Sequence, residues 1–388
     1  MFFNTVIGVP PRRASRWGAG LLLALGVGLV GCSGDEVATT ATTEDAPVAA
    51  DGPVVVATTG VLCDLTEQIA ESTVALTCLL EPGTDPHTYQ VRPSDRQALE
   101  QADLILYDGY DYAPSIIAMV EGGSTDAVRV AVYEAAVPDP LLGEVHDHDH
   151  AHGDDHAHDD DHAHDDDHAH GDDHGHDHSA EAAHDHSAEA AHDHDATADA
   201  DLVPDPHVWH SARNNGAIAA VIADYLAQVN PEQADLYVEN AERLSAQFAD
   251  IDGWIQTQVA TVPAEQRQLV TTHDSFGYFA DAYGFEVKGA LSGLSTEEQP
   301  TPGAMTALVD QVKSAEVSAI FAEDTTNPRL IEAVARDAGV AVADQPLFVE
   351  GPGGPGSGAE TTQEMLVVNT CTMVDALGGS CDRASAPL

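Results

Sequence analysis

Positive charge is scarce in this chain of 388 residues. Only two lysines occur, Lys288 and Lys313, and Lys and Arg together number 14 against 66 Asp and Glu, which gives a formal net charge of −52. Nucleic acid and anionic membrane surfaces bind proteins through clustered positive charge, so we exclude both as partners. The acidity instead favours the attraction of cations, or adaptation to salty surroundings.

The N-terminus lacks an apolar run long enough to span a membrane. Residues 18–30 are apolar but too short, and they follow a cluster of arginines, which is the arrangement of a signal peptide over residues 1–31. The sequence Leu-Val-Gly-Cys at 29–32 resembles a bacterial lipobox, which implies that Cys32 becomes the lipidated first residue. Residues 32–52 are then a flexible tether. We expect an exported lipoprotein, at the cell surface or in the periplasm, held to the membrane by its lipid alone.

Cysteine is rare, with five in the chain. Besides Cys32 there are Cys63, Cys78, Cys371 and Cys381, and none belongs to a CxxC pair, which argues against a thiolate zinc site. An exported protein meets an oxidising environment in which disulfides persist. Four cysteines allow three pairings, and the most local of these joins Cys63 to Cys78 and Cys371 to Cys381.

Histidine is abundant, and its placement is informative. Of the 21 histidines, 17 lie in residues 146–194, a low-complexity run that also carries 15 Asp and 2 Glu. Without apolar periodicity this run cannot form a core, so we expect an insertion over residues 146–197 that is disordered without metal. Its imidazoles would bind several metal ions weakly, to raise the local zinc concentration or to sense surplus; the alternative is an inert, solvated charge run. The auxiliary metal ligands assigned to it are His146, His148, His150, His152, His156, His158, His162, His164, His168, His170, His174, His176 and His178.

Short apolar runs alternate with amphipathic stretches on both sides of this insertion, which predicts an α/β fold with parallel sheets. Strands are predicted at residues 54–57, 74–80, 104–107, 128–133, 269–272, 287–291, 319–322 and 340–342. Helices are predicted at residues 62–71, 93–101, 215–229, 303–315, 327–338 and 361–377. A long helix over 230–262, opened by Pro231, suits a rigid connector between two lobes, residues 53–229 and 263–388.

The histidines outside the insertion include three in places typical of ligand sites. His87 and His207 each follow Asp-Pro, and His273 directly follows the predicted strand 269–272. Loops beyond the carboxyl ends of strands bind ligands in α/β proteins, and imidazole is the most common protein ligand of zinc-like cations. Glu350, after an apolar run and before a Gly/Pro-rich turn, is a fourth candidate. These residue types in these places predict a metal site.

Three motifs resemble the zinc-binding solute-binding lipoproteins of bacterial ABC metal importers. They are E-P-G-T-D-P-H-T-Y at residues 81–89, D-P-H-V-W at 205–209 and T-H-D-S-F-G-Y-F at 272–279, in the family order and with a His/Asp-rich loop between the first two. The resemblance covers about residues 53–380 and implies two lobes joined by a rigid helix, with the metal in the cleft between them. It also implies hand-over of the metal to an ABC permease with its ATPase. We expect a monomer that catalyses no reaction.

The resemblance implies a role for each ligand. His87 and His207 would bind the metal from the first lobe and His273 from the second. The family's last ligand is usually an aspartate, whereas this chain has Glu350, whose longer side chain changes the reach and whose place water could take. Members that prefer manganese usually carry a glutamate where this chain has His273. Three imidazoles and one carboxylate suit tetrahedral Zn2+, whereas Mn2+ prefers more oxygen ligands.

Other functions stay open at this point. A manganese or iron receptor of the same type is disfavoured by His273. A periplasmic zinc buffer or adhesin would use the insertion as its main function. A zinc hydrolase would use three histidines and an open coordination position, but the chain has no H-E-x-x-H helix and no nucleophile motif. We expect His210 at the surface or beside the ligands, and Glu323 and Asp324 in a solvated loop at the end of a strand.

Overall fold

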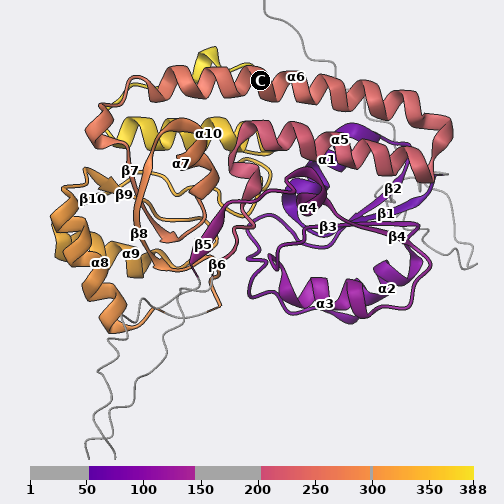
Figure 1. The fold of residues 1–388 in the computed structure, drawn as a ribbon, viewed down its shortest axis with the longest axis horizontal. Coiled ribbons are helices and arrows are strands. Elements are labelled where there is room, and N and C mark those ends of the chain that lie inside the picture. The colour runs from indigo at the N-terminus through magenta and orange to yellow at the C-terminus, as the bar shows by residue number, and fades with distance from the viewer. Residues whose placement is uncertain (1–51, 145–201, 298–299) are drawn as a thin grey trace, which may run out of the picture. The chain divides into compact units, whose positions relative to one another are not determined.

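Figure 1 shows the fold in a computed structural model, which describes residues 52–144, 202–297 and 300–388. The predicted signal peptide, Cys32 with its tether, and the auxiliary histidines from His146 to His178 lie outside the described residues. The described part is α/β, with two lobes of parallel strands joined by a long helix, as predicted.

The first lobe is built on a four-stranded parallel sheet in the order β2-β1-β3-β4. Its elements are β1 (Val54–Ala57), α1 (Gly60–Ala70), β2 (Ala75–Cys78), α2 (Pro93–Gln101), β3 (Leu104–Tyr107), α3 (Pro114–Gly122), β4 (Val128–Ala131) and α4 (Val132–Ala136). Successive side chains of a strand point to opposite faces of its sheet. Accordingly, Val55 belongs to one buried cluster with Leu62 of α1, and Val56 belongs to another with Ile116 of α3. Helices therefore cover both faces, with α2 and α3 below the sheet in Figure 1.

The second lobe contains two pairs of parallel strands, β7 with β8 and β9 with β10. Its elements are β7 (Gln268–His273), α7 (Gly277–Tyr283), β8 (Glu286–Ser292), α8 (Pro302–Ala315), β9 (Ala319–Ile320), α9 (Pro328–Ala338), β10 (Ala341–Val342) and α10 (Thr362–Ala376). The two pairs are connected, because the backbone N–H of Phe321 donates to Val270 O at 2.9 Å. Some of its helices begin at a side-chain cap: the Thr301 side chain caps α8, and Thr361 forms a capping box with Glu364 at α10.

Two long helices, α5 (Ala212–Val229) and α6 (Ala234–Val259), pack side by side, and α6 connects the lobes. In Figure 1, α6 runs along the top of both lobes, and it packs on α1 of the first and on α10 of the second. It begins later than predicted, because Pro231–Gln233 forms a 3-10 turn before it. Within the described stretches, no helix is both long and apolar enough to cross a membrane. Helix α6 buries one face, whose residues recur at a spacing of three to four: Tyr237, Ala241, Leu244, Phe248, Ile251, Ile255 and Val259.

Several elements differ from the sequence-based expectation. A short antiparallel ribbon of β5 (Leu142–Glu144) and β6 (Leu202–Pro204) was not predicted, because three-residue strands show too little alternation. Helix α3 was not predicted either. The strand expected over residues 128–133 was too long: β4 ends at Ala131, and the apolar run continues into α4. An apolar run alone does not distinguish a buried strand from a buried helix.

Both disulfides follow the most local pairing. Cys63 of α1 is bonded to Cys78 of β2 with a Cα–Cα distance of 5.6 Å, and Cys371 of α10 is bonded to Cys381 with a Cα–Cα distance of 5.1 Å. Each bond fastens a helix to a neighbouring segment of its own lobe.

Candidate metal site

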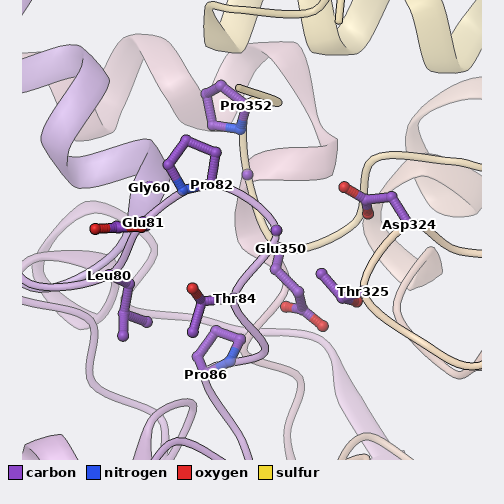
Figure 2. A pocket seen from close by; sticks show the side chains of 12 residues that line it. Gly60, Leu80, Glu81, Pro82, Thr84, Pro86, Asp324, Thr325, Glu350 and Pro352 are labelled. Atoms are coloured by element: carbon purple, nitrogen blue, oxygen red, sulfur yellow. The ribbon is translucent and has the colours of Figure 1, made fainter. Parts of the chain in front are cut away.

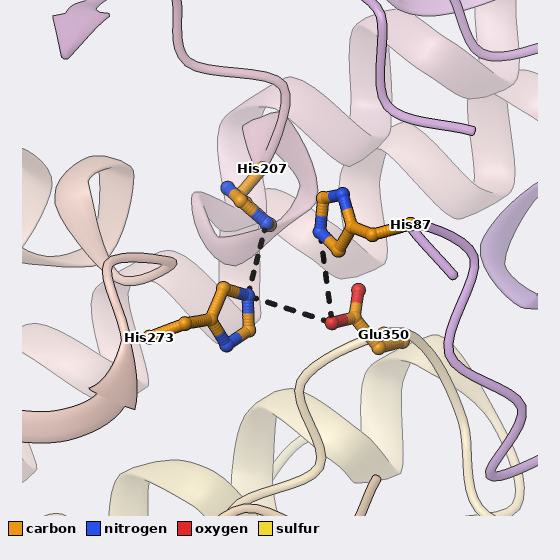
Figure 3. Close-up of side chains that lie close together, drawn as sticks. All are labelled: His87, His207, His273 and Glu350. Atoms are coloured by element: carbon orange, nitrogen blue, oxygen red, sulfur yellow. Dashed lines mark hydrogen bonds and ion pairs between the residues drawn. The ribbon is translucent and has the colours of Figure 1, made fainter. Parts of the chain in front are cut away.

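Four side chains that are far apart in the sequence converge between the two lobes (Figure 3). They are His87, His207, His273 and Glu350, and one donor atom of each lies within 4.8 Å of the others. All four residues are at most 6% exposed to solvent. Among the residues that the structure describes, this is the one group of three or more His, Cys, Asp or Glu side chains close enough to hold an ion together.

His87 and His207 are presented by the same local turn. Each follows Asp-Pro, and in each case the Asp carboxylate accepts a hydrogen bond from the histidine backbone N–H: Asp85 Oδ1 at 3.0 Å and Asp205 Oδ1 at 2.9 Å. An Asp that bonds the backbone two residues further on forms an Asx turn, and the intervening proline restricts φ. The repeated D-P-H sequence therefore fixes the backbone from which each imidazole projects.

His273 and Glu350 come from the carboxyl ends of chain segments in the second lobe. His273 is the last residue of β7, and Glu350 follows a segment in which Leu347 forms a parallel bridge with Glu323. The carboxyl edge of a parallel sheet is where α/β folds place ligands. The second lobe thus supplies one imidazole and one carboxylate, and the first lobe supplies two imidazoles.

The distances between the donor atoms suit a small divalent cation. His273 Nε2 lies 3.3 Å from His207 Nε2 and 3.5 Å from Glu350 Oε1, and His87 Nε2 lies 3.9 Å from the same oxygen. A tetrahedral ion with bonds of about 2.0–2.1 Å places its ligand atoms roughly 3.3–3.4 Å apart. His87 Nε2 and Glu350 Oε1 are buried and have no hydrogen-bond partner. Because such orphaned atoms are costly, the donor set fits a bound cation.

Two of the imidazoles are oriented by carboxylates. His207 Nδ1 is hydrogen-bonded to Asp205 Oδ1 at 2.9 Å, and His273 Nδ1 is hydrogen-bonded to Glu323 Oε2 at 2.7 Å. A bond at one ring nitrogen fixes the tautomer and the ring direction of a metal-binding histidine. In both rings the bond at Nδ1 leaves Nε2 directed at the shared space (Figure 3).

Tyr112 supports the other two members of the cluster. Its backbone is hydrogen-bonded to His87, and its hydroxyl donates to Glu350 Oε2 at 2.6 Å. Its ring meets the His87 ring edge-on, with centroids 5.1 Å apart. Sequence reasoning missed Tyr112, since no local pattern distinguishes it from the neighbouring Tyr110.

Glu323 is buried, so the prediction that it lies in a solvated loop was wrong. It is 2% exposed, and its Oε1 accepts hydrogen bonds from the backbone N–H groups of Thr272 and His273, each at 2.9 Å. The bridge to Leu347 keeps Glu323 at the edge of the sheet, beside the end of β7. Asp324 is also partly buried. The strand-end rule that selected His273 applied equally to Glu323, which directly follows a predicted strand.

The three imidazoles of the cluster differ in the direction in which their surroundings shift the pKa. Burial and the neighbouring imidazoles hold the pKa of His87 and His207 well below the usual range. Burial alone would also lower the pKa of His273, but the charge of Glu323 and its hydrogen bond outweigh burial and raise that pKa to about 9. Burial raises the pKa of Glu350 to about 7. Two imidazoles are therefore neutral at pH 7, whereas a cation must displace a proton from His273.

His210 lies beside the cluster and is not one of the converging residues. It is 1% exposed, its ring stacks on Phe276 with centroids 4.2 Å apart, and it is hydrogen-bonded to the backbone of Val349. Trp209 also donates to Val349 O, at 3.0 Å. The two side chains thus hold the segment that leads into Glu350.

A small hollow of about 10 Å³ adjoins Glu350 (Figure 2). Residues 80–84 of the first lobe and residues 324–325 and 350–352 of the second line most of it. This volume is at the lower limit of what can hold a single water molecule. Among the four converging residues Glu350 alone lines it, so the hollow touches the cluster at Glu350.

The family model described as "Zinc-uptake complex component A periplasmic" (ZnuA) matches residues 55–376. The chain belongs to this family. The match spans both lobes and all four converging residues, and it confirms the resemblance predicted from the three motifs.

Relatives of this ZnuA-family chain include proteins named for different metals. The manganese-binding lipoprotein MntA of Halalkalibacterium halodurans is 28% identical, over 92% of this chain and 97% of its own length. The high-affinity zinc uptake system protein ZnuA of Paracoccus denitrificans is 33% identical, over 74% of this chain and 81% of its own length. The solved structure of the periplasmic zinc-binding protein TroA from Treponema pallidum matches with a TM-score of 0.66 at 27% identity, covering 84% of this chain and 99% of TroA.

Proposed function

We propose that this protein is the extracytoplasmic receptor of a zinc importer, which binds Zn2+ with high affinity between its lobes. It delivers the ion to an ABC permease, and the ATPase of the transporter drives uptake. The observation that carries the proposal is the convergence of three buried imidazoles and one buried carboxylate. This nitrogen-rich set of four is one that tetrahedral zinc prefers. Membership of the ZnuA family supports the role in uptake.

In this proposal Nε2 of His87, His207 and His273 and Oε1 of Glu350 hold the ion. An ion at this point would satisfy both orphaned atoms, His87 Nε2 and Glu350 Oε1. Bonds to Asp205 and Glu323 keep two of the rings in the tautomer that presents Nε2 to the ion.

A manganese receptor of the same type is the second candidate, because relatives are named as manganese-binding lipoproteins. We favour zinc because His273 gives the site a third imidazole, whereas Mn2+ prefers sites rich in oxygen and of higher coordination number. The same reasoning disfavours iron.

We propose that the protein is not an enzyme. A zinc hydrolase keeps an open coordination position for the water that it activates. Here Glu350 Oε1 lies 3.5 Å from His273 Nε2, where it would take the fourth position of a tetrahedral ion.

We propose that the mature protein is an exported monomer, anchored through a lipid on Cys32 at the cell surface or in the periplasm. Residues 53–229 and 263–388 would be its lobes, with residues 230–262 as the linking segment. The His/Asp-rich insertion over residues 146–197 would hold further zinc weakly. In a zinc buffer or adhesin the insertion would instead carry the main function.

The test is chelator-competition titration, with zinc and with manganese, of the mature protein lacking residues 146–194. We expect one tight site that prefers zinc, and a loss of more than about 100-fold in zinc affinity in His273→Ala, because a direct ligand should count for more than an outer one. His210→Ala is the comparison variant: it removes a buried imidazole that holds the segment leading into Glu350 without converging on the site, so it should lower the affinity clearly less than His273→Ala does. Absence of a tight site in the deletion protein would favour the buffer, and tighter binding of manganese would favour the second candidate.

A further inference from the structure

The two oxygens of Glu350 have different surroundings. Oε1 has no hydrogen-bond partner and lies 3.5 Å from His273 Nε2 and 3.9 Å from His87 Nε2. Oε2 accepts a hydrogen bond from the Tyr112 hydroxyl at 2.6 Å. In Figure 3 the dashed lines from His87 and His273 to Glu350 end on the same carboxylate oxygen.

We propose that Tyr112 is a specificity-determining residue, because it reserves Oε2 and leaves Glu350 a single oxygen for the ion. The site then stays four-coordinate, which favours zinc over manganese. This inference rests on the proposed function, since it concerns the same metal site.

Tyr112 is held rigidly in this position. It is fully buried, and its ring lies 5.1 Å from the His87 ring, 4.8 Å from the Trp209 ring and 6.3 Å from the Tyr133 ring, measured between centroids. Close-packed aromatic side chains do not swing away without displacing their neighbours. The hydroxyl therefore stays within reach of Glu350 whenever the lobes are closed.

The hydrogen bond from Tyr112 to Oε2 weakens the binding of manganese more than the binding of zinc. Zinc completes a tetrahedron with three imidazoles and Oε1 alone, so the bond from Tyr112 can remain. Manganese gains from additional oxygen ligands, and in this cluster the nearest additional oxygen is Oε2. To bind it, manganese must weaken or break a short, buried hydrogen bond to a carboxylate, and bonds of this kind are among the stronger ones in proteins.

The test compares Tyr112→Phe with the wild-type protein. Tyr133→Phe is the matched control, because Tyr133 is equally buried and packs in the same aromatic cluster, while its hydroxyl makes no hydrogen bond to Glu350. Two quantities are measured: the ratio of zinc to manganese affinity by chelator competition, and the intensity of visible absorption of the Co2+-loaded protein. That absorption is strong for four-coordinate Co2+ and weaker at higher coordination number.

In Tyr112→Phe we expect the zinc-to-manganese affinity ratio to fall about tenfold, equivalent to about 1.4 kcal/mol. We also expect the Co2+ absorption to weaken as the freed Oε2 joins the ion. The Tyr133 variant should match the wild type in both. An unchanged ratio and an unchanged spectrum in Tyr112→Phe would overturn the proposal.

A second measurement does not depend on how the variant folds. In a structure of the zinc-loaded wild-type protein, Oε2 should keep its hydrogen bond to Tyr112; Oε2 within about 2.2 Å of the ion would overturn the proposal. If the wild-type protein binds neither metal tightly, the proposed function fails, and this outcome is distinct from a selective wild type with an equally selective variant.

Discussion

Replacing Glu323 by Gln tests whether the carboxylate behind His273 sets the state of that imidazole. The two oxygens of Glu323 accept three hydrogen bonds, from His273 Nδ1 at 2.7 Å and from the backbone N–H groups of Thr272 and His273 at 2.9 Å each. A carboxylate satisfies three donors, whereas an amide offers one acceptor oxygen and one donor NH2 group. The amide must therefore turn its NH2 either to the backbone donors or to Nδ1. In the second case the ring proton moves to Nε2, where the ion would bind.

The expected loss depends on pH. Removal of the outer partner of a metal-binding histidine typically lowers metal affinity about 10- to 100-fold, which corresponds to about 1.4–2.7 kcal/mol. In the wild type a proton on His273, whose pKa is raised to about 9, competes with zinc as the pH falls below that value. This competition costs about tenfold in affinity for each pH unit. Because Gln lacks the charge that retains this proton, the affinity of the variant should rise less between pH 7 and pH 9, and its deficit should be largest at pH 9.

The measurement is chelator-competition titration of both proteins with zinc at pH 7, 8 and 9. Glu332→Gln, which removes an exposed carboxylate from α9 of the same lobe, is the control for a change in net charge. Unchanged zinc affinity of Glu323→Gln at pH 9 would refute the reasoning. So would a pH slope equal to that of the wild type, since Glu323 would then not control the proton on His273.

Two further substitutions test the frame around the site. Asp108 is buried, accepts hydrogen bonds from Thr58 and Thr59, and has its pKa raised by burial from 3.8 to about 7; its stabilising contribution is therefore complete below about pH 4 and is lost as the pH rises through 7. The unfolding free energy of the metal-free wild type should therefore fall by at most roughly 4 kcal/mol as the pH rises from 4 to above 7, and Asp108→Asn should remove this fall in urea titrations. A difference in unfolding free energy between wild type and variant that does not change with pH would contradict the prediction. Replacing Cys371 and Cys381 by Ser opens a loop with a sequence separation of 10 and should lower the unfolding free energy by about 3 kcal/mol in the same titration; no change would mean that the disulfide does not constrain the unfolded chain.

The elements that could be predicted are those with a strong local signal. Strands β1 and β3 were placed to the residue, because each is a short apolar run bounded by polar residues or by Gly and Pro. Helix α6 was recognised from its stripe of apolar residues, although its start was misplaced by the turn at Pro231. The β5–β6 ribbon could not be found, because its pairing is decided by the return of the chain after residue 201 and not by local pattern.

The residues of the site also fall into those with a local signal in the sequence and those without one. The converging residues were selected by chemical type and by their place after strands or in D-P-H turns, all of which are local properties. Tyr112 could not be selected, because its partner Glu350 is 238 residues away and belongs to the other lobe. Glu323 was misjudged for a related reason: its burial depends on the bridge to Leu347, and its three donors belong to the end of β7.

These contacts also indicate how a tight site could release its ion. In the first lobe, Asp85 fixes the backbone of His87, and Asp205 fixes both the backbone and the ring of His207. In the second lobe Glu323 fixes His273 in the same manner. None of these bonds crosses between the lobes.

Other contacts do cross, including those from Tyr112 to Glu350 and from Trp209 to Val349. Separation of the lobes would break these bonds and divide the ligands of the ion. It would leave each half of the site oriented by its own carboxylates. Preorganised halves reduce the ordering cost of the next binding event. Affinity would then come from closure of the lobes, and because opening does not dismantle either half, the receptor could release its ion to the permease and still rebind tightly.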